Sequence, residues 1–408
     1  MSHGTAPTTG GHVPSKNGSH PTIAVPPRVG GPGSSALDRV HGMLGIHPGL
    51  LLLVAALVLY PLIGSDYWVN NVSAGLVLAI SALGLLVVVG WGREISLTQA
   101  GLTGSALYIS GYAARGGNPG ESGWDLPFPL AAGVGILFAV AVSALVALVA
   151  MRLAGVYVIV LTLSLQFLIE NSLFTEEKLT GGLSSPVTPR PEVLGMKLSC
   201  NLPCTATLSS DDRIYYFILA FLLVSMYFLY RFRNSRFGRS MIMVGVDQAA
   251  AAAVGVSPWK YKVAAFAVGG FFAGLGGALL APLYGNPPGV FEYNSFNSLF
   301  YLSIPIMAGF ESLMAVVAVA LLFRLLPQIL LEFNFDINGY LLGGLGLALG
   351  ILMGPRGVGG RISDIFDSRA RTKRKAARAS ASRNAAGGGG APPRTEARVP
   401  ATAGSESK

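Results

Sequence analysis

The stretch "VAAFAVGGFFAGLGGALLAPLYG" occupies residues 263–285 and contains no charged side chain. Gly270 and Gly274 are four residues apart, and so are Ala273 and Gly277, which places small residues on shared sides of a helix. Small residues at this spacing let neighbouring transmembrane helices pack closely. A helix crosses a bilayer with about 20 apolar residues. The stretch therefore predicts a tightly packed transmembrane helix, and with it a membrane fold.

The composition of the whole chain agrees with a membrane protein. Of its 408 residues, 51% are hydrophobic and only 12% are charged, whereas soluble domains carry about 25% charged residues. The formal net charge of +9 is explained by the Lys and Arg that cytoplasmic loops of membrane proteins collect. No basic face with interleaved aromatic residues appears outside the termini, so we expect no nucleic-acid partner.

Apolar runs recur along the chain and predict an all-α, polytopic membrane fold with about ten transmembrane helices, eight to ten being compatible with the run lengths. The segment 95–114 is semi-polar and rich in small residues, and 296–310 is short enough to be re-entrant. An even number of spans places both termini on one side, and the basic loops mark that side as cytoplasmic. The ten candidates are residues 48–64, 69–91, 95–114, 126–150, 154–174, 213–231, 262–282, 296–310, 313–332 and 339–353.

Both ends of the chain differ from this apolar centre. Residues 1–45 consist mainly of Gly, Pro, Ser, Thr and His without an apolar core, so they predict a disordered cytoplasmic arm and no signal peptide. Residues 361–408 are basic and predict a disordered cytoplasmic tail. The transmembrane domain is thus expected at residues 46–360.

The sequence signatures of catalysis are missing. The chain has no G-x-x-x-x-G-K-[ST] phosphate-binding loop and no H-E-x-x-H or G-x-S-x-G motif. We therefore expect no enzyme, no metal site and no cofactor bound by this chain. All five histidines precede or begin the first predicted span: His3, His12, His20, His41 and His47.

Two cysteines, Cys200 and Cys204, lie in the polar loop 175–212, on the side opposite the termini. Disulfides persist on that outer side. A Cys200–Cys204 disulfide would restrain the loop, and two free thiols are the alternative. Half of a metal site is the less supported interpretation, because no histidine is nearby.

Polar residues inside the predicted spans are the remaining candidates for a binding site, because polar groups in a bilayer face a cavity or a partner helix. Gln166 and Glu170 are four residues apart and share one helix face. We hypothesise that Glu170 pairs with Arg324, since both lie in the outer half of their spans. Hydrogen bonding between helices is the competing explanation. The candidate pathway-lining residues are Ser96, Gln99, Thr103, Thr162, Gln166 and Glu170.

A basic, Ala-rich segment separates two of the apolar runs and reads "RFRNSRFGRSMIMVGVDQAAAAAVGVSPWKYK" at residues 231–262. Ala favours helix because its side chain loses no entropy. We therefore predict a helix at 240–256 that ends at Gly255, before Ser257 and Pro258. Small side chains would let a partner's groove approach this helix closely, and a plain connecting loop is the alternative.

Several stretches, taken together, resemble the permease family of branched-chain amino acid ABC transporters, and among its two paired permeases the longer one. The resemblance covers about residues 50–360. It rests on "SRFGR" at 235–239 with the Ala-rich helix and "KYK" at 260–262, "ISLTQAGLTGSALYISGYAA" at 95–114, "RLAGVYVIVLTLSLQFLIEN" at 152–171, "LTGG" at 179–182 and "MGPRGVGG" at 353–360.

The resemblance implies a permease subunit of an importer in a bacterial cell membrane. Two homologous permeases would form the pathway for amino acids, in first place branched-chain ones, and two cytoplasmic ATPases would bind ATP and Mg²⁺. An extracytoplasmic protein would deliver the solute. A short cytoplasmic helix in the 236–258 loop would dock on the ATPase. The residues assigned to this coupling are Arg236, Phe237, Gly238, Arg239, Asp247, Ala250, Ala253, Gly255 and Pro258.

The chain also departs from the family pattern. "GSALY" stands at 104–108 and "AGFES" at 308–312, where the family usually has glycine-richer sequences. These departures bear on the substrate, and permeases for urea or short amides belong to the same family. An ion-coupled secondary transporter of a small polar solute is the alternative from another class, with Glu170 as its deep acid.

Overall fold

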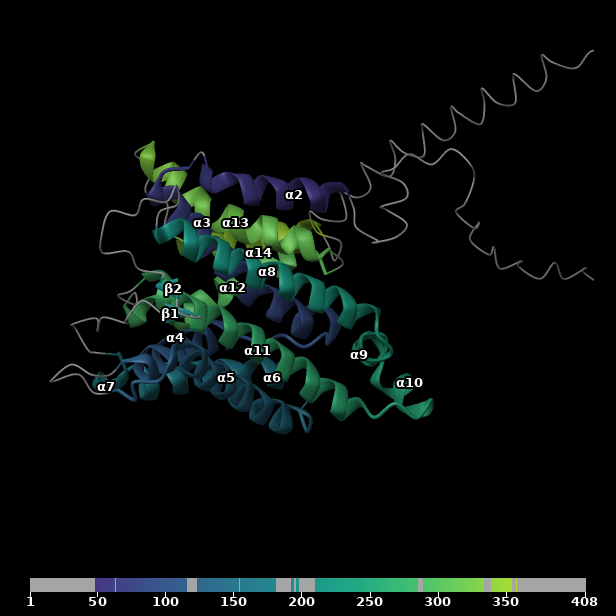
Figure 1. Cartoon of the computed structure of the whole chain (residues 1–408). Helices are drawn as coiled ribbons and strands as arrows, with labels where there is room; N and C mark the ends of the chain where they lie inside the picture. Colours follow the sequence, from purple (N-terminus) through teal and green to yellow (C-terminus); the bar gives the residue numbers. More distant parts are fainter. Residues whose placement is uncertain are drawn as a thin grey trace, which may run out of the picture. The chain divides into compact units, whose positions relative to one another are not determined.

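The computed structural model describes residues 48–62, 64–115, 123–153, 155–180, 192–193, 196–197, 210–284, 289–310, 312–333, 339–353 and 357. Helices dominate this part of the chain (Figure 1). Its two strands are only two residues long, and β1 (Glu192–Val193) pairs antiparallel with β2 (Met196–Lys197). The prediction of an all-α fold is thus confirmed for the described residues. The predicted arms 1–45 and 361–408, and both Cys200 and Cys204, lie outside them.

The chain divides into two compact units, Met1–Ala55 and Ala56–Lys408. In the first unit the structure describes only the beginning of helix α2 (Pro48–Leu59). The second unit contains the elements discussed below. They are η1 (Tyr60–Leu62), α3 (Asp66–Leu86), η2 (Val87–Trp91), α4 (Gln99–Ala114), α5 (Phe128–Ala150), α6 (Val156–Leu168), η3 (Ile169–Leu173), α7 (Glu177–Thr180), α8 (Ser210–Asn234), α9 (Arg236–Val246), α10 (Gln248–Ala253), α11 (Pro258–Tyr284), η4 (Val290–Tyr293), α12 (Ser295–Ala308), α13 (Leu313–Glu332) and α14 (Gly339–Met353).

Six helical segments of the described chain are long and apolar enough to cross a membrane. Three further apolar helices are shorter: Leu53–Leu62, Ser295–Ala308 and Leu341–Leu352. Each of the ten predicted segments contains helix, but the predicted count of about ten spans is not confirmed. The six long segments are Asp66–Trp91, Phe128–Ala150, Val156–Leu173, Asp211–Asn234, Pro258–Tyr284 and Leu313–Glu332.

Helix α11 packs against α3, α4 and α5. Glycines make this packing close, because a Cβ on Gly270 would lie 2.6 Å from the Cβ of Ser143, and one on Gly274 would lie 2.9 Å from the Cα of Ile136. Both neighbours belong to α5. The Gly270–Gly274 ridge read from the sequence therefore has the packing role that small residues serve in membrane helices.

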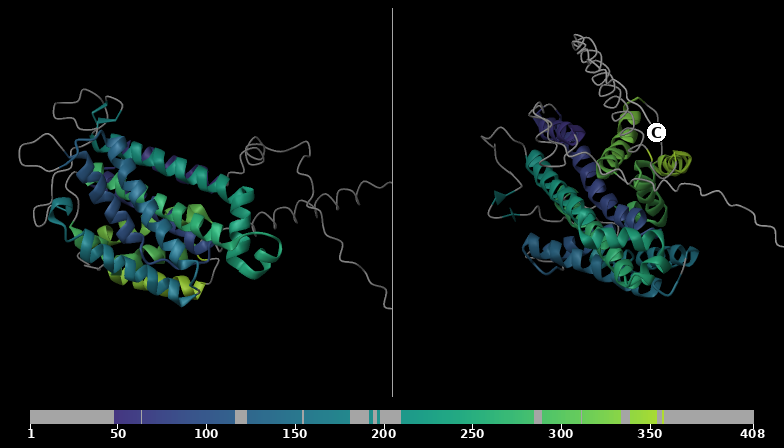
Figure 2. Two further views of the ribbon diagram at one scale, coloured as in Figure 1. Left: turned by 90° about the horizontal axis from the view of Figure 1, so that it is seen from below. Right: turned by 90° about the vertical axis from the view of Figure 1, so that its right-hand side faces the viewer.

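Helices α9 and α10 form the connection between α8 and α11 (Figure 1; Figure 2, left). Side chains of α8, α9, α11 and η2 meet in an aromatic row at the base of this connection. The ring of Phe232 lies 6.2 Å from Trp91 and 5.7 Å from Phe237, whose ring is 4.7 Å from Tyr261. The row joins α9 to the ends of three other elements.

Candidate functional site

The chain between α3 and α4 is not helical. The π-helix η2 ends at Trp91 and α4 begins at Gln99, so the predicted span 95–114 starts as irregular, non-helical chain. Backbone groups inside a membrane protein need partners other than water. The N–H of Leu97 donates to Oγ1 of Thr162 at 3.2 Å, and the hydroxyls of Ser96 and Thr98 are 3.0 Å apart. This break places the first turn of α4 within the protein interior.

Side chains from two other helices bind the first turn of α4. The first N–H groups of a helix have no partner within it. Here the N–H of Gly101 donates to Oε1 of Gln166 at 2.8 Å, and the N–H of Ala100 donates to Oγ of Ser298 at 3.3 Å. Helices α6 and α12 thus supply the cap that α4 lacks from its own residues.

Gln166 is the centre of this polar network. Its Nε2 donates to the carbonyl of Tyr293 at 2.9 Å, and its Oε1 also accepts from Oγ of Ser298 at 3.1 Å. The side chain is fully buried at 0% exposure. One amide group therefore joins α4, α6, η4 and α12.

Gln99 and Thr103 connect α4 to α3. Nε2 of Gln99 donates to the carbonyl of Ser81 at 2.7 Å, and Oγ1 of Thr103 lies 3.5 Å from Oγ of Ser81. Oγ1 of Thr162 also donates to the carbonyl of Ile159 at 3.0 Å. Five of the six predicted pathway residues are at most 3% exposed, and their geometry is that of hydrogen bonding between packed segments: Ser96, Gln99, Thr103, Thr162 and Gln166.

Glu170, the sixth predicted pathway residue, is partly exposed and lies in the π-helix η3. Its Oε2 accepts two hydrogen bonds from Ser295, at 3.1 Å from N and 2.8 Å from Oγ. The hypothesised partner Arg324 instead donates from Nη2 to the hydroxyl of Tyr284 at 3.2 Å. The Glu170–Arg324 pair is therefore wrong. π-helical turns are frequent at functional sites, and Glu170 combines such a turn with partial exposure.

A buried ion pair lies near the start of α4. Nζ of Lys262 is 2.5 Å from Oε1 of Glu94, and the two side chains are 8% and 11% exposed. Sequence reasoning missed this pair, because it treated Lys262 only as part of a basic segment. The signal that could have found it is a lone acidic residue in a loop otherwise predicted to be basic.

The coupling segment contains two helices instead of the single helix predicted at 240–256. Asp247 separates α9 from α10, and its Oδ1 accepts from the N–H groups of Ala249 at 2.9 Å and Ala250 at 3.0 Å. Asp is a strong N-cap residue, so it begins a new helix. The predicted end is confirmed: α10 stops at Ala253, and Gly255 follows with a φ of +82°.

The assigned coupling residues differ in their surroundings. Oγ of Ser235 caps α9 by accepting from the N–H of Gly238 at 3.1 Å, and Gly238 is buried against α8. The Phe237 side chain is only partly available to a partner, because its ring packs in the aromatic row described above. The remaining assigned positions are mostly exposed, Pro258 being intermediate: Arg236, Arg239, Asp247, Ala250, Ala253, Gly255 and Pro258.

An apolar surface with small side chains covers α10 and its flanks. Val246 and Val254 are 70% and 69% exposed. Ala251 is fully buried and anchors α10. We define the coupling surface by its exposed members: Val246, Ala249, Ala250, Ala252, Ala253 and Val254.

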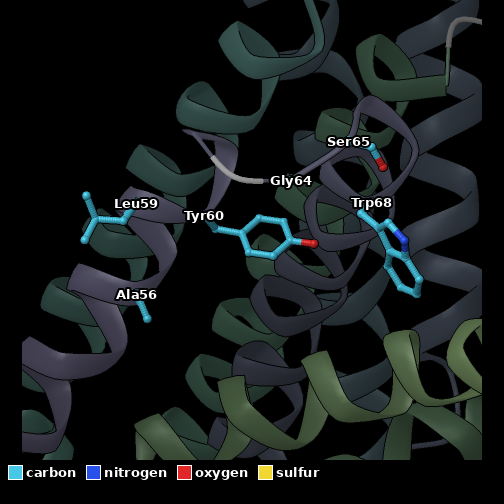
Figure 3. Close-up of a pocket in the computed structure, with 6 residues that line it drawn as sticks. All are labelled: Ala56, Leu59, Tyr60, Gly64, Ser65 and Trp68. Atoms are coloured by element: carbon cyan, nitrogen blue, oxygen red, sulfur yellow. The ribbon is translucent and has the colours of Figure 1, made fainter.

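A pocket of about 520 Å³ lies elsewhere, at the connection between η1 and α3 (Figure 3). Figure 3 shows the Tyr60 ring directed toward Trp68. The lining holds no carboxylate, histidine or basic side chain, and its titratable group is the Tyr60 hydroxyl: Ala56, Leu59, Tyr60, Gly64, Ser65 and Trp68. Among the described residues no group of three or more His, Cys, Asp or Glu could hold a metal ion.

Comparisons with known proteins agree on one kind of protein. A family model described as the permease component of branched-chain amino acid transport systems matches residues 67–350. The high-affinity branched-chain amino acid transport system permease protein LivM of Escherichia coli (strain K12) is 28% identical over 327 residues, which is 76% of this chain and 74% of LivM. LivM of Salmonella typhimurium (strain LT2) is 27% identical over 325 residues, with the same coverage of 76% and 74%. No solved structure matches.

Proposed function

We propose a function from one premise: this chain belongs to the family of permease components of branched-chain amino acid transport systems. We infer that it is a membrane-spanning permease subunit of an ATP-binding cassette importer. It forms part of a pathway for amino acids, in first place branched-chain ones, in a bacterial cell membrane with both termini in the cytoplasm. It works with a second permease, two cytoplasmic ATPases and an extracytoplasmic solute-binding protein.

The observation that carries this proposal is the exposed coupling surface on α9 and α10. Exposed apolar patches on proteins mark interaction sites, and an apolar helix face fits a hydrophobic groove. The side chains between Val246 and Val254 are Ala except for Asp247 and Gln248, so a groove can approach the helix backbone closely. Exposed Arg236 and Arg239 lie in the first turn of α9, the helix that leads to this surface, and favour acidic groups on the partner.

The packing beneath the coupling surface supports the transmission of a movement of α9 to the membrane-spanning helices. A Cβ on Gly92, at the end of η2, would lie 3.2 Å from the Cβ of Ala265 in α11. A Cβ on Gly245 in α9 would lie 3.0 Å from the Cγ of Arg93. The loop that leads into α4 thus touches both α9 and α11. A displacement of α9 would be passed to the first turn of α4.

Energy for transport comes, in this proposal, from ATP and Mg²⁺ bound by the partner ATPases. The chain itself has no phosphate-binding loop, and we assign it no catalytic residue. The ion-coupled alternative would need a carboxylate that gains and loses a cation or proton. Oε2 of Glu170 already accepts two hydrogen bonds from Ser295, so this oxygen is less available to bind a coupling cation.

The test substitutes the coupling surface and follows ATPase binding. Ala250→Glu adds bulk and negative charge to an exposed position, so membrane insertion should be normal while the ATPase no longer co-purifies and ATP-driven leucine uptake falls at least about ten-fold. Ala250→Ser at the same position is the matched control and should retain both. The readouts are membrane yield, co-purifying ATPase and uptake into proteoliposomes containing all subunits.

A second pair of variants uses Gly255, whose positive φ strains any other residue. Gly255→Arg should abolish uptake, whereas Gly255→Ala carries the same strain without the bulk and should reduce uptake less. Retained uptake in both Ala250→Glu and Gly255→Arg would refute the coupling role. Uptake by the purified chain alone, driven by an ion gradient, would establish the secondary transporter instead.

A further inference from the structure

Helix α6 and the π-helix η3 have two different faces. The inner face carries Val158, Thr162 and Gln166, each 0% exposed. Thr162 and Gln166 belong to the polar network that holds α4. The opposite face of the same segment is exposed, beginning with Tyr157 and Val160. This outer face covers no other described element of the chain.

Uncharged polar side chains lie on the exposed face, mainly toward its carboxyl end. Residues four apart share one side of an α-helix, which joins Ser164 to Leu168. Asn171 and Ser172 follow in η3, and Thr175 in the turn after it donates from Oγ1 to the carbonyl of Asn171 at 2.9 Å. We define the α6 polar strip as the exposed polar residues of this face: Ser164, Asn171, Ser172 and Thr175. Glu170 lies at its edge and is partly exposed.

The neighbouring helix α5 shows what a lipid-facing surface of this protein looks like. Its exposed large side chains are apolar, with Leu137 at 69% and Leu145 at 63%. Its polar residue Ser143 is buried and donates to the carbonyl of Phe266 at 2.6 Å. Helix α14 likewise exposes Leu341 and Leu352. Helix α6 also exposes apolar Phe167 and Leu168, but exposed polar side chains follow them in η3 and the turn after it.

The hydrogen bonds of the strip use donors of Asn171, Ser172 and Thr175, but none of its side-chain oxygens accepts one from the described part of the chain. Nδ2 of Asn171 donates to the carbonyl of Phe167 at 2.8 Å, and Oγ of Ser172 donates to the carbonyl of Leu168 at 2.5 Å. The oxygens of both side chains remain able to accept. Lipid tails offer no donor to them, and an unsatisfied polar group in hydrocarbon costs several kcal/mol. These oxygens therefore require water or a solute.

We propose that the α6 polar strip lines the water-filled translocation pathway, and that its oxygens, with the free Oε1 side of the Glu170 carboxylate, accept hydrogen bonds from the ammonium group of an amino acid. The proposal rests on the proposed function and deepens it. It assigns the pathway to the exposed face of α6. The buried residues of the inner face then position this helix, and they do not contact the solute.

Cysteine accessibility tests the proposal in the assembled transporter. In a chain whose native cysteines are changed to serine (Cys200→Ser, Cys204→Ser), single cysteines replace Ser164, Asn171 or Thr175. The matched controls are Leu137→Cys and Leu145→Cys on α5, two positions that are likewise exposed in the chain. The probe is a membrane-impermeant, positively charged thiol reagent. We expect the strip positions to react at least about ten-fold faster than the controls, because thiols in lipid are shielded from such reagents.

Protection by a solute then distinguishes a position that binds substrate from one that contacts only water. Saturating leucine should slow the reaction of the Asn171→Cys thiol, while urea and acetamide should not. Equal reaction rates at the strip and control positions would overturn the proposal, even where leucine uptake persists. Protection by urea instead of leucine would overturn the amino-acid assignment. Both measurements record thiol reaction rates and not ATP-driven uptake, so failure of the coupling role gives a separate result.

Uptake kinetics provide a second test that does not depend on thiol chemistry. Asn171→Leu removes the acceptor and makes the strip resemble α5. It should raise the KM for leucine or lower the uptake rate at least about ten-fold, without loss of membrane yield. Leu145→Met on α5 is the control and should behave as the parent. Unchanged uptake kinetics in Asn171→Leu would count against a pathway position.

Discussion

Lys262 and Glu94 form a buried ion pair whose Nζ and Oε1 are 2.5 Å apart, with side chains 8% and 11% exposed. Lys262 lies in the second turn of α11, the helix that follows α10, and Glu94 lies in the irregular chain before α4. The pair therefore connects the start of α11, which follows the proposed coupling surface, to the chain that leads into the polar network. Removing one partner of a buried pair leaves an uncompensated charge.

We expect Glu94→Gln to destabilise the protein by about 3–5 kcal/mol, the usual cost of breaking a buried pair from one side. Uptake should also fall, because the irregular chain before α4 loses its connection to α11. The measurement is thermal unfolding of the purified protein in detergent, together with uptake in proteoliposomes. Exposed Lys260→Gln is the matched control and should change stability by less than about 0.5 kcal/mol. The exchange Glu94→Lys with Lys262→Glu should recover part of the loss, and no recovery would show that the contact is not electrostatic.

The second prediction concerns the centre of the polar network. Gln166→Leu removes the acceptor of the Gly101 N–H and the donor to the Tyr293 carbonyl. Each buried group left without a partner costs about 1–3 kcal/mol, so the melting temperature in detergent should fall strongly. Ser164→Ala, on the exposed face of the same helix, should leave it nearly unchanged. If both variants melt alike, the network does not stabilise the fold.

Helix packing provides the third prediction. A Cβ at Gly270 would lie 2.6 Å from the Cβ of Ser143, whereas a Cβ at Gly133 on α5 would meet nothing within 4 Å. We expect Gly270→Ala to destabilise by about 1–3 kcal/mol through overpacking, and Gly133→Ala to be neutral or stabilising because Ala favours helix. Thermal unfolding compares the two. A stable Gly270→Ala protein would mean that α5 and α11 can separate without cost.

The apolar runs predicted where the helices of this chain lie, because a span needs only length and hydrophobicity. The break before α4 was not predicted, since "ISLT" at 95–98 carries no Gly or Pro to mark it. Its cause is tertiary: Thr162 binds the N–H of Leu97, 65 positions earlier in the sequence. Gln166 likewise meets Tyr293 across 127 positions. Contacts over such separations leave no local pattern in one sequence.

The candidate site could be predicted only in part, because its contacts also depend on how the helices pack. A polar residue inside a span can bind a neighbouring helix or face a pathway, and spacing alone does not distinguish the two. Gln166 and Glu170 share a helix face by spacing, but only Glu170 is partly exposed. The Glu170–Arg324 pair was wrong because equal depth in the membrane does not determine the direction of a side chain around its helix axis. The exposed Asn171, next to Glu170, was not singled out.

The last prediction concerns Asp247, which begins α10 by accepting from Ala249 and Ala250. Asp247→Ala should destabilise α10 by about 1 kcal/mol, the usual loss for an N-cap residue, and should speed amide hydrogen exchange in residues 248–253. Because α10 carries most of the coupling surface, ATPase binding should weaken while the spans stay intact. Asp247→Asn keeps the cap without the charge, so it should keep both the exchange protection and the ATPase. If Asp247→Asn loses the ATPase while α10 remains protected, the charge of Asp247 itself contacts the partner, and its role as a cap is secondary.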